Sequence, residues 1–139
     1  MRNPEMLNRL ADFMMDNISN ISSAHSIADA LKNGGEKAND KTVGAYMDYL
    51  CEAFAFYRVR RYDIRGKRYL ISGDRYYLAD HAFRYAKLGT RNMDWGHVYE
   101  NMVAIKLMRR GWEIYAGVAL GNAASGFAIW RATNKGCNV

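Results

Sequence analysis

The chain has 139 residues, half of them hydrophobic, with one proline and a formal net charge of +6. This composition allows one domain with a hydrophobic core and part of a second, and it argues against a long disordered linker. No apolar run approaches the ~20 residues that span a bilayer, and the first residues are typical of an amphipathic helix rather than a signal peptide, so we expect no membrane association.

Histidine and cysteine are too scattered to predict a metal site or a disulfide framework. The three histidines, His25, His81 and His97, are far apart, and none has a Cys or carboxylate at the spacing of metal ligands. Cys51 falls within the apolar stripe of a predicted helix, and Cys137 lies near the C-terminus. We therefore expect no metal, no cofactor and a cytoplasmic location.

The first predicted element is a helix that begins at Asn3-Pro4. Asparagine caps helix N-termini well, and proline is tolerated at the first helical position because its missing N–H had no partner there. Apolar residues then repeat at helical spacing until the pattern fades between residues 17 and 20. They are Met6, Leu7, Leu10, Phe13 and Met14. We interpret this segment as a packing helix.

Two further helices follow, joined by a short polar loop, and together they predict a helix–turn–helix. Ser22 or Ser23 caps the first of them, and Gly34-Gly35 ends it where the chain turns with positive φ. Its apolar repeat is Ala24, Ile27, Ala28 and Leu31. The second helix has Asn39 or Asp40 as its cap, a buried stripe of Val43, Met47, Leu50 and Phe54, and Tyr46 and Cys51 beside that stripe.

The opposite face of the second helix is the one that we expect to meet a partner. In a helix–turn–helix this helix enters the major groove of DNA. Asp48 and Glu52 would repel phosphates, so only the first turn, with Lys41 and Thr42, looks suited to DNA. Tyr49 could stack on a base, although a tyrosine on a half-exposed helix face more often serves packing.

A β-hairpin is predicted next. Its first strand covers residues 56–63, Arg65-Gly66 supplies the turn, and residues 67–71 return as the second strand. Alternation sends Phe56, Arg58, Arg60 and Tyr62 to one side, and Tyr57, Val59, Arg61 and Asp63 to the other. Gly73-Asp74 then turns the chain into a further strand at residues 75–79.

Nearly all of the positive excess lies in this hairpin. Between residues 57 and 68, six basic side chains accompany one acidic side chain. A local basic stripe favours a polyanionic partner, because basic side chains at a hairpin tip can reach a phosphate backbone. The predicted nucleic-acid contacts are Lys41, Thr42, Arg58, Arg60, Arg61, Arg65, Lys67 and Arg68. The alternative is a strand face that arginine merely keeps solvated.

The remaining residues predict an unfinished second unit. A short helix ends at Gly89, a longer helix runs from Asp94 to Arg110, and residues 112–116 form a strand. The expected apolar face of the longer helix is Trp95, Val98, Met102, Ile105 and Arg109, and Tyr99, Val103 and Leu107 add to it, so we expect much of this helix to be covered. No acidic residue follows Glu113, and residues 118–139 form a weakly patterned tail with one predicted strand at 127–130.

We therefore predict an α+β fold in two parts. Residues 1–89 would form a winged-helix-like domain, in which a β-hairpin wing follows the helix–turn–helix. Residues 90–139 would form an incomplete α/β unit of a helix and short strands. An open sheet edge is commonly covered by another chain, so we also expect a homodimer through the C-terminal helix and strand.

The chain resembles the C-terminal region of a bacterial and archaeal family of AAA-type ATPases in two runs, TVGAYMDYLCEAFAFYRVRRYDIRGKRYLISGDRYYLADHAFRY and WGHVYENMVAIKLMRRGWEIYAG. In that family the region is a domain of unknown function behind the ATPase module, and the similarity covers residues 3–117. The resemblance implies a winged-helix-like unit followed by the start of a restriction-endonuclease-like fold.

The catalytic features of that family are not carried over. Glu100 falls on the family's helical Glu, but the hairpin Asp and the Glu-x-Lys strand are missing because no acidic residue follows Glu113. The sequence also lacks the phosphate-binding pattern G-x-x-x-x-G-K-[ST]. We expect neither ATPase nor metal-dependent nuclease activity, and a tail from residue 118 that truncation or a frameshift has altered.

Two functions remain open at this point. The first is nucleic-acid binding, indicated by the helix–turn–helix–wing pattern and the clustered arginines. The second is a protein-interaction or dimerisation module, which Asp48, Glu52 and the unfinished second unit favour. Catalysis is the weakest hypothesis, because Glu100 is its only candidate and an active site needs several partners.

Overall fold

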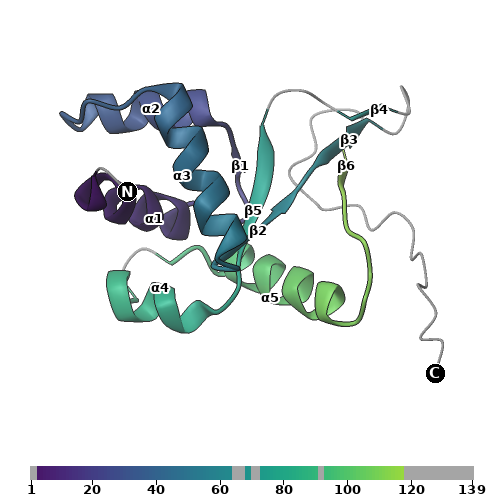
Figure 1. Ribbon diagram of the computed structural model, residues 1–139. Coiled ribbons are helices and arrows are strands. Elements are labelled where there is room, and N and C mark those ends of the chain that lie inside the picture. The colour runs from purple at the N-terminus through teal and green to yellow at the C-terminus, as the bar shows by residue number, and fades with distance from the viewer. Residues whose placement is uncertain (1–2, 64–67, 70–72, 91–92, 118–139) are drawn as a thin grey trace.

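Five helices and six short strands make up the described part of the chain, residues 3–63, 68–69, 73–90 and 93–117 of this computed structural model (Figure 1). The helices are α1 (Pro4–Asp16), α2 (Ala24–Asn33), α3 (Asp40–Glu52), α4 (His81–Leu88) and α5 (Trp95–Arg109). The strands are β1 (Ile21–Ser22), β2 (Phe56–Val59), β3 (Arg61–Asp63), β4 (Arg68–Tyr69), β5 (Asp74–Leu78) and β6 (Ala116–Gly117). The predicted α+β class is confirmed.

Local capping chemistry explains where the first three helices begin. The side chain of Asn3 accepts a hydrogen bond from the Met6 N–H, and proline occupies the first turn of α1. Ser23 and Ser26 form a capping box at the start of α2, and Asn39 accepts from the Thr42 N–H at the start of α3. Each cap satisfies an N–H that the helix leaves without a partner. These three predicted starts are confirmed.

The predicted buried stripe of α3 is wrong at its C-terminal end. Val43 and Met47 are buried as expected, but Phe54 is 70% exposed. The helix ends at Glu52, and Phe54 adopts a left-handed conformation with φ of 55°. This turn points Phe54 outward and lets Phe56, two residues later, fill the core at 1% exposure.

The main sheet has the strand order β1-β5-β2, and both of its pairings are antiparallel. Phe56 lies opposite Leu78, and Val59 lies opposite Arg75. Side chains alternate along β5, so Tyr76 and Leu78 join the core formed with α1, α2 and α3. The strand after the predicted hairpin therefore lies in the middle of the sheet, and β1 is an edge strand that the sequence pattern did not reveal.

A second small sheet extends the hairpin away from the main one. Its order is β4-β3-β6, with β4 antiparallel and β6 parallel to β3. Tyr62 pairs with Tyr69, which confirms that the predicted hairpin strands meet. Arg60 separates β2 from β3, so the single strand predicted at residues 56–63 is divided between the two sheets. The predicted turn at residues 64–67, the end of the returning strand and the tail strand at 127–130 lie outside the described residues.

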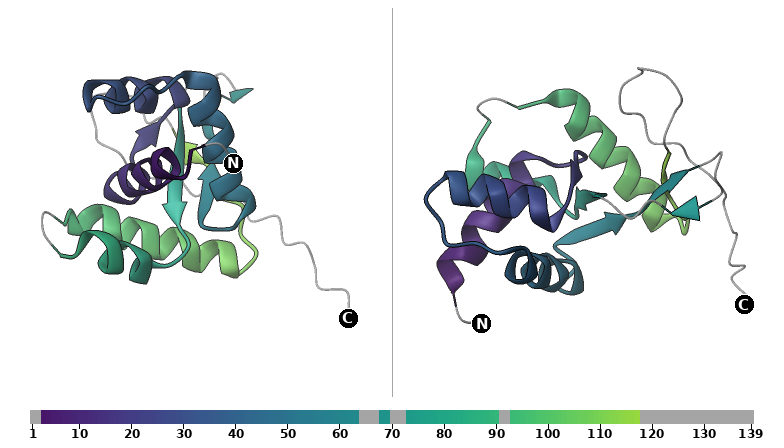
Figure 2. Two further views of the ribbon diagram at one scale, coloured as in Figure 1. Left: turned by 60° about the vertical axis from the view of Figure 1, so that its left-hand side comes forward. Right: turned by 90° about the horizontal axis from the view of Figure 1, so that it is seen from above.

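Helix α5 covers the face of the main sheet that α1, α2 and α3 leave open (Figures 1 and 2). The predicted apolar face of α5 is confirmed at Val98 and Ile105, which are buried, and is wrong at Trp95 and Met102, which are more than half exposed. The helix also buries Asn101 and Ala104, which the prediction did not include. An apolar residue occurs on nearly every side of α5, so its periodicity did not single out one face.

Helix α4 is tied to α1 by a buried arginine. Arg84 is 3% exposed and donates hydrogen bonds to the Met15 carbonyl oxygen and to Asp16. Asp80 caps the start of α4, and the predicted stop at Gly89 is confirmed. The strand predicted at 112–116 is wrong in extent, since strand β6 covers Ala116–Gly117. None of the helices in the described residues is long and apolar enough to cross a membrane.

Candidate nucleic-acid interface

The first turn of α3 carries two of the predicted contacts. Lys41 is exposed and Thr42 is half-buried. The Thr42 N–H donates to Asn39 Oδ1 at 2.8 Å, which fixes the start of the helix and leaves the Thr42 hydroxyl outside that bond. The N-terminal end of a helix also carries a partial positive charge, so this turn can meet an anionic group.

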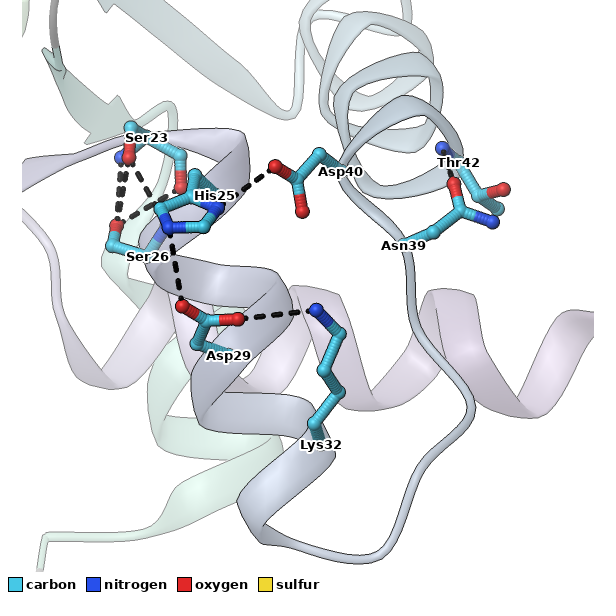
Figure 3. Close-up of polar contacts among 8 residues, drawn as sticks. All are labelled: Ser23, His25, Ser26, Asp29, Lys32, Asn39, Asp40 and Thr42. Carbon is cyan, nitrogen blue, oxygen red and sulfur yellow. Dashed lines mark hydrogen bonds and ion pairs between the residues drawn. The ribbon is translucent and has the colours of Figure 1, made fainter.

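A histidine links α2 to α3 at this end (Figure 3). The Nδ1 atom of His25 lies 2.8 Å from Asp40 Oδ2, and its Nε2 atom lies 3.3 Å from Asp29 Oδ2. The hydrogen bond to Asp40 and the charge of Asp29 raise the pKa of His25 above its ordinary value. The two carboxylates lie on opposite sides of the ring, so the arrangement braces the two helices rather than surrounding an ion.

An ion pair alters the acidic face of α3. Arg58 in β2 binds Asp48 through its guanidinium and also lies 5.5 Å from the centre of the Tyr76 ring. Asp74 Oδ2 lies 3.9 Å from Arg58 Nε. Asp48 was expected to repel phosphates, but Arg58 compensates its charge. Arg58 stays a predicted phosphate contact, although its guanidinium already has a carboxylate partner.

The other predicted contacts lie along the hairpin. Arg60 occupies the junction between β2 and β3, Arg61 lies in β3, and Arg68 lies in β4, where its backbone is opposite that of Asp63. Arg65 and Lys67 fall outside the described residues. The backbone thus brings Arg61 and Arg68 onto neighbouring strands, while Lys41 and Thr42 lie at the start of a separate helix.

A buried ion pair accounts for Glu100, the residue that the family resemblance singled out. Arg75 binds Glu100, with side-chain exposures of 5% and 13%. The Tyr77 hydroxyl donates to Glu100 Oε1 at 3.0 Å. Because its carboxylate is held by two side chains of β5, Glu100 serves to attach α5 to the sheet.

Sequence reasoning missed this attachment, and it missed a second one beside it. Asn101 Oδ1 accepts from the Leu78 N–H at 2.7 Å, and Asn101 Nδ2 donates to the Leu78 carbonyl oxygen at 2.8 Å. Alternation along β5 offered one signal, because it places Arg75 on the same face as Tyr77. A buried arginine requires a carboxylate, but the sequence did not say which one.

The described residues contain no group of three or more His, Cys, Asp or Glu side chains that could hold a metal ion. The pKa of Cys51 is raised by its burial, which disfavours the reactive thiolate.

Comparison with known proteins adds a family but no activity. The sequence profile of a family described as "Domain of unknown function (DUF8612)" matches residues 1–94. A Haemophilus influenzae protein described as "Uncharacterized protein" is 30% identical over 105 residues, which are 76% of this chain and 26% of that protein. The chain thus spans about a quarter of the length of this relative. No solved structure matches the chain.

Neither match bears on the resemblance to the AAA-associated region, which stays a prediction. The profile match covers helices α1 to α4, the main sheet, and strands β3 and β4 of the second sheet. It ends at Asp94, the cap of α5. Two thirds of the sequence, including the candidate interface, lie within it. The chain belongs to the DUF8612 family.

Proposed function

We propose that this chain is a winged-helix module that binds nucleic acid through the first turn of α3 and the basic β3–β4 hairpin. The observation that carries the proposal is the strand order β1-β5-β2, in which the strand after the hairpin returns to the middle of the sheet. Helix, strand, two helices, strand, hairpin and strand is the element order of a winged helix, and the helix before the hairpin is its recognition helix.

The surface of α3 is compatible with this role. Lys41 and Tyr49 are exposed, and the charge of Asp48 is compensated by Arg58. Glu52, the other acidic residue of this face, lies in the last turn, and Asp40, the acidic residue of the first turn, is bound by His25. A phosphate contact at the first turn would therefore meet Lys41 and the helix N-terminus together.

The hairpin would supply the remaining electrostatic attraction. We retain Arg58, Arg60, Arg61, Arg65, Lys67 and Arg68 as proposed backbone contacts. Such contacts provide affinity without sequence preference and release counterions, so binding weakens steeply with salt. The proposal includes a cytoplasmic location and no ATPase or nuclease activity, and it keeps the AAA-associated region as the predicted relative.

Fluorescence anisotropy with a ~20-base-pair duplex and a single strand tests the proposal at several salt concentrations. We expect the logarithm of the affinity to fall linearly with the logarithm of salt concentration. The double variant Arg65→Ala/Lys67→Ala should bind all sequences more weakly and reduce the slope by about 2, and Lys41→Ala should reduce it by about 1.

Arg110→Ala is the matched control, since it removes one exposed positive charge at the C-terminus of α5. It should leave both affinity and slope almost unchanged. If the wild-type chain binds neither probe at low salt, or if the control weakens binding as much as Lys41→Ala does, the proposed interface is wrong.

A further inference from the structure

An exposed aromatic stripe runs along α5 on the side that the sheet does not cover. Trp95, Tyr99 and Met102 are 53%, 60% and 54% exposed. The Trp95 and Tyr99 ring centroids lie 6.0 Å apart with an interplanar angle of 33°. Monomeric proteins rarely leave large apolar side chains clustered in this way, so such a patch indicates a surface for a partner.

The stripe borders a groove of about 420 Å³ between α4 and α5. Tyr85 and His81 of α4 form one wall, and Val98 and Ile105 of α5 lie at its base. The groove is open and its α5 lining runs from Trp95 to Arg109, so a helix fits it better than a compact ligand does. Its C-terminal end carries Lys106 and Arg109, for which the described residues provide no ion pair.

The spacing of these residues is that of a coiled-coil seam. Trp95, Tyr99, Met102, Lys106 and Arg109 are separated by four, three, four and three residues. This a/d pattern places them in one line along about 22 Å of helix. The line is aromatic at the N-terminal end, has methionine in the middle and is cationic at the C-terminal end.

We propose that a second copy of this chain occupies the stripe, with the two α5 helices antiparallel and Met102 at the two-fold axis. In this arrangement Trp95 of one chain meets Arg109 of the other, and Tyr99 meets Lys106. Both pairs are cation–π contacts, in which the ring face attracts the positive charge. A parallel arrangement would instead oppose Lys106 to Lys106 and Arg109 to Arg109, so charge complementarity selects the antiparallel one.

The proposed interface is small. Two 15-residue helices in contact along one seam bury less than the about 1,600 Å² of a standard interface, even with Tyr85 added. We therefore expect a reversible dimer with a dissociation constant of about 10–100 µM. The proposed dimer does not depend on the nucleic-acid proposal, and if both hold, each dimer carries two nucleic-acid surfaces.

Sedimentation equilibrium of the full chain from about 1 to about 500 µM tests the dimer. Trp95→Ala/Tyr99→Ala should raise the dissociation constant at least about tenfold, because aromatic residues at the centre of an interface carry most of its affinity. Phe54→Ala is the matched control, since it removes an exposed aromatic ring that does not belong to α5 and should leave the constant unchanged.

Cross-linking tests the orientation. In a chain carrying Cys51→Ser and Cys137→Ser, one preparation carries Tyr99→Cys and a second carries Lys106→Cys. A short bis-maleimide added to the mixture should join position 99 to position 106 across the dimer. A monomer at every concentration, or a cross-link mainly between two copies of position 106, would overturn the proposal. So would a monomer whose duplex binding is lost on Trp95→Ala/Tyr99→Ala, since the stripe would then be a nucleic-acid surface.

Discussion

The side chain of Asn101 forms hydrogen bonds with the backbone of β5 at a position where a neighbouring strand would otherwise form them. Strand β1 pairs only with residues 74 and 75, so the backbone of Leu78 lacks a strand partner on that side. The carboxamide of Asn101 offers one donor and one acceptor, and it binds both backbone groups of Leu78. A polar side chain thus becomes fully buried on a helix because it completes a sheet.

Asn101→Ala should lower the free energy of unfolding by about 2–4 kcal/mol, because it leaves the buried N–H and carbonyl oxygen of Leu78 without partners. Urea unfolding measures this loss as a shift in midpoint at constant slope. Asn8→Ala, an exposed asparagine of α1, should change stability by less than about 0.5 kcal/mol. Equal effects of the two variants would show that the Asn101 bonds do not matter.

Because the hydroxyls of Tyr76 and Tyr77 are largely buried, we expect the protein to lose stability at alkaline pH. Burial raises the pKa of Tyr76 to about 12, and burial together with the Glu100 charge raises the pKa of Tyr77. In the unfolded chain both hydroxyls titrate near ~10. Above that pH the unfolded state loses protons that the folded state keeps, so the stabilisation present below pH ~10 is lost as the pH rises to about 12.

Urea unfolding between pH ~8 and ~12 should show this fall, with a contribution from each tyrosine of up to about 1.4 kcal/mol per pH unit. Tyr77→Phe should make the fall shallower, whatever its effect at neutral pH. Tyr49→Phe, which alters an exposed tyrosine of α3, should leave the steepness unchanged. A pH profile that is flat above ~10 would contradict the burial of these two hydroxyls.

At the scale of elements, the join between β1 and β5 depends on the glycine that precedes β5. Gly73 has φ of +71°, and a Cβ added there would lie 2.8 Å from Ile21 Cγ2 in β1. Gly35, after α2, has φ of +89° but nothing within 4 Å of an added Cβ. An alanine in place of Gly35 would therefore introduce backbone strain alone, whereas an alanine in place of Gly73 would also press against β1.

Gly35→Ala should cost about 1 kcal/mol, the price of a left-handed conformation for a residue with a Cβ. Gly73→Ala should cost about 2–3 kcal/mol, because Ile21 and with it β1 must also move. Thermal or urea unfolding of the two variants measures the difference. Equal losses would indicate that β1 adjusts freely and contributes little to the sheet.

At the scale of the whole molecule, α5 connects the two predicted domains. It covers Val59 and Tyr77 on one face of the main sheet, and it supplies Glu100 to the buried Arg75. The domain boundary predicted between residues 89 and 90 would separate this helix from the surface that it buries. That boundary stays a prediction until the parts are tested separately.

A fragment of residues 1–94 tests it, with residues 1–117 as the reference. Without α5, Arg75 keeps a buried charge with no partner and Tyr77 becomes exposed, so we expect a midpoint in urea far below that of the reference, or no cooperative transition. Circular dichroism follows both fragments. A fragment of residues 1–94 as stable as the reference would confirm an independent winged-helix-like domain.

The features that the sequence predicted well are local ones. Helix starts at Asn3, Ser23, Asn39 and Asp94 depend on a side chain and an N–H two or three residues away. The hairpin strands around Tyr62 and Tyr69 depend on a short turn between them. Such signals lie within a few residues of one another, so a pattern search can recover them. The α+β class followed from their order.

By itself, the sequence determined the helices, their caps, the basic hairpin and the aromatic and cationic spacing along α5, because each depends on residues close together in the chain. Only the tertiary structure decided which face of α5 is buried, that Glu100 pairs with Arg75, and that Arg58 compensates Asp48. These pairings join residues on different elements, and an apolar or charged side chain has several suitable partners in the sequence. Which partner it meets is settled by the sheet order and by the requirement that buried charges and backbone groups be satisfied.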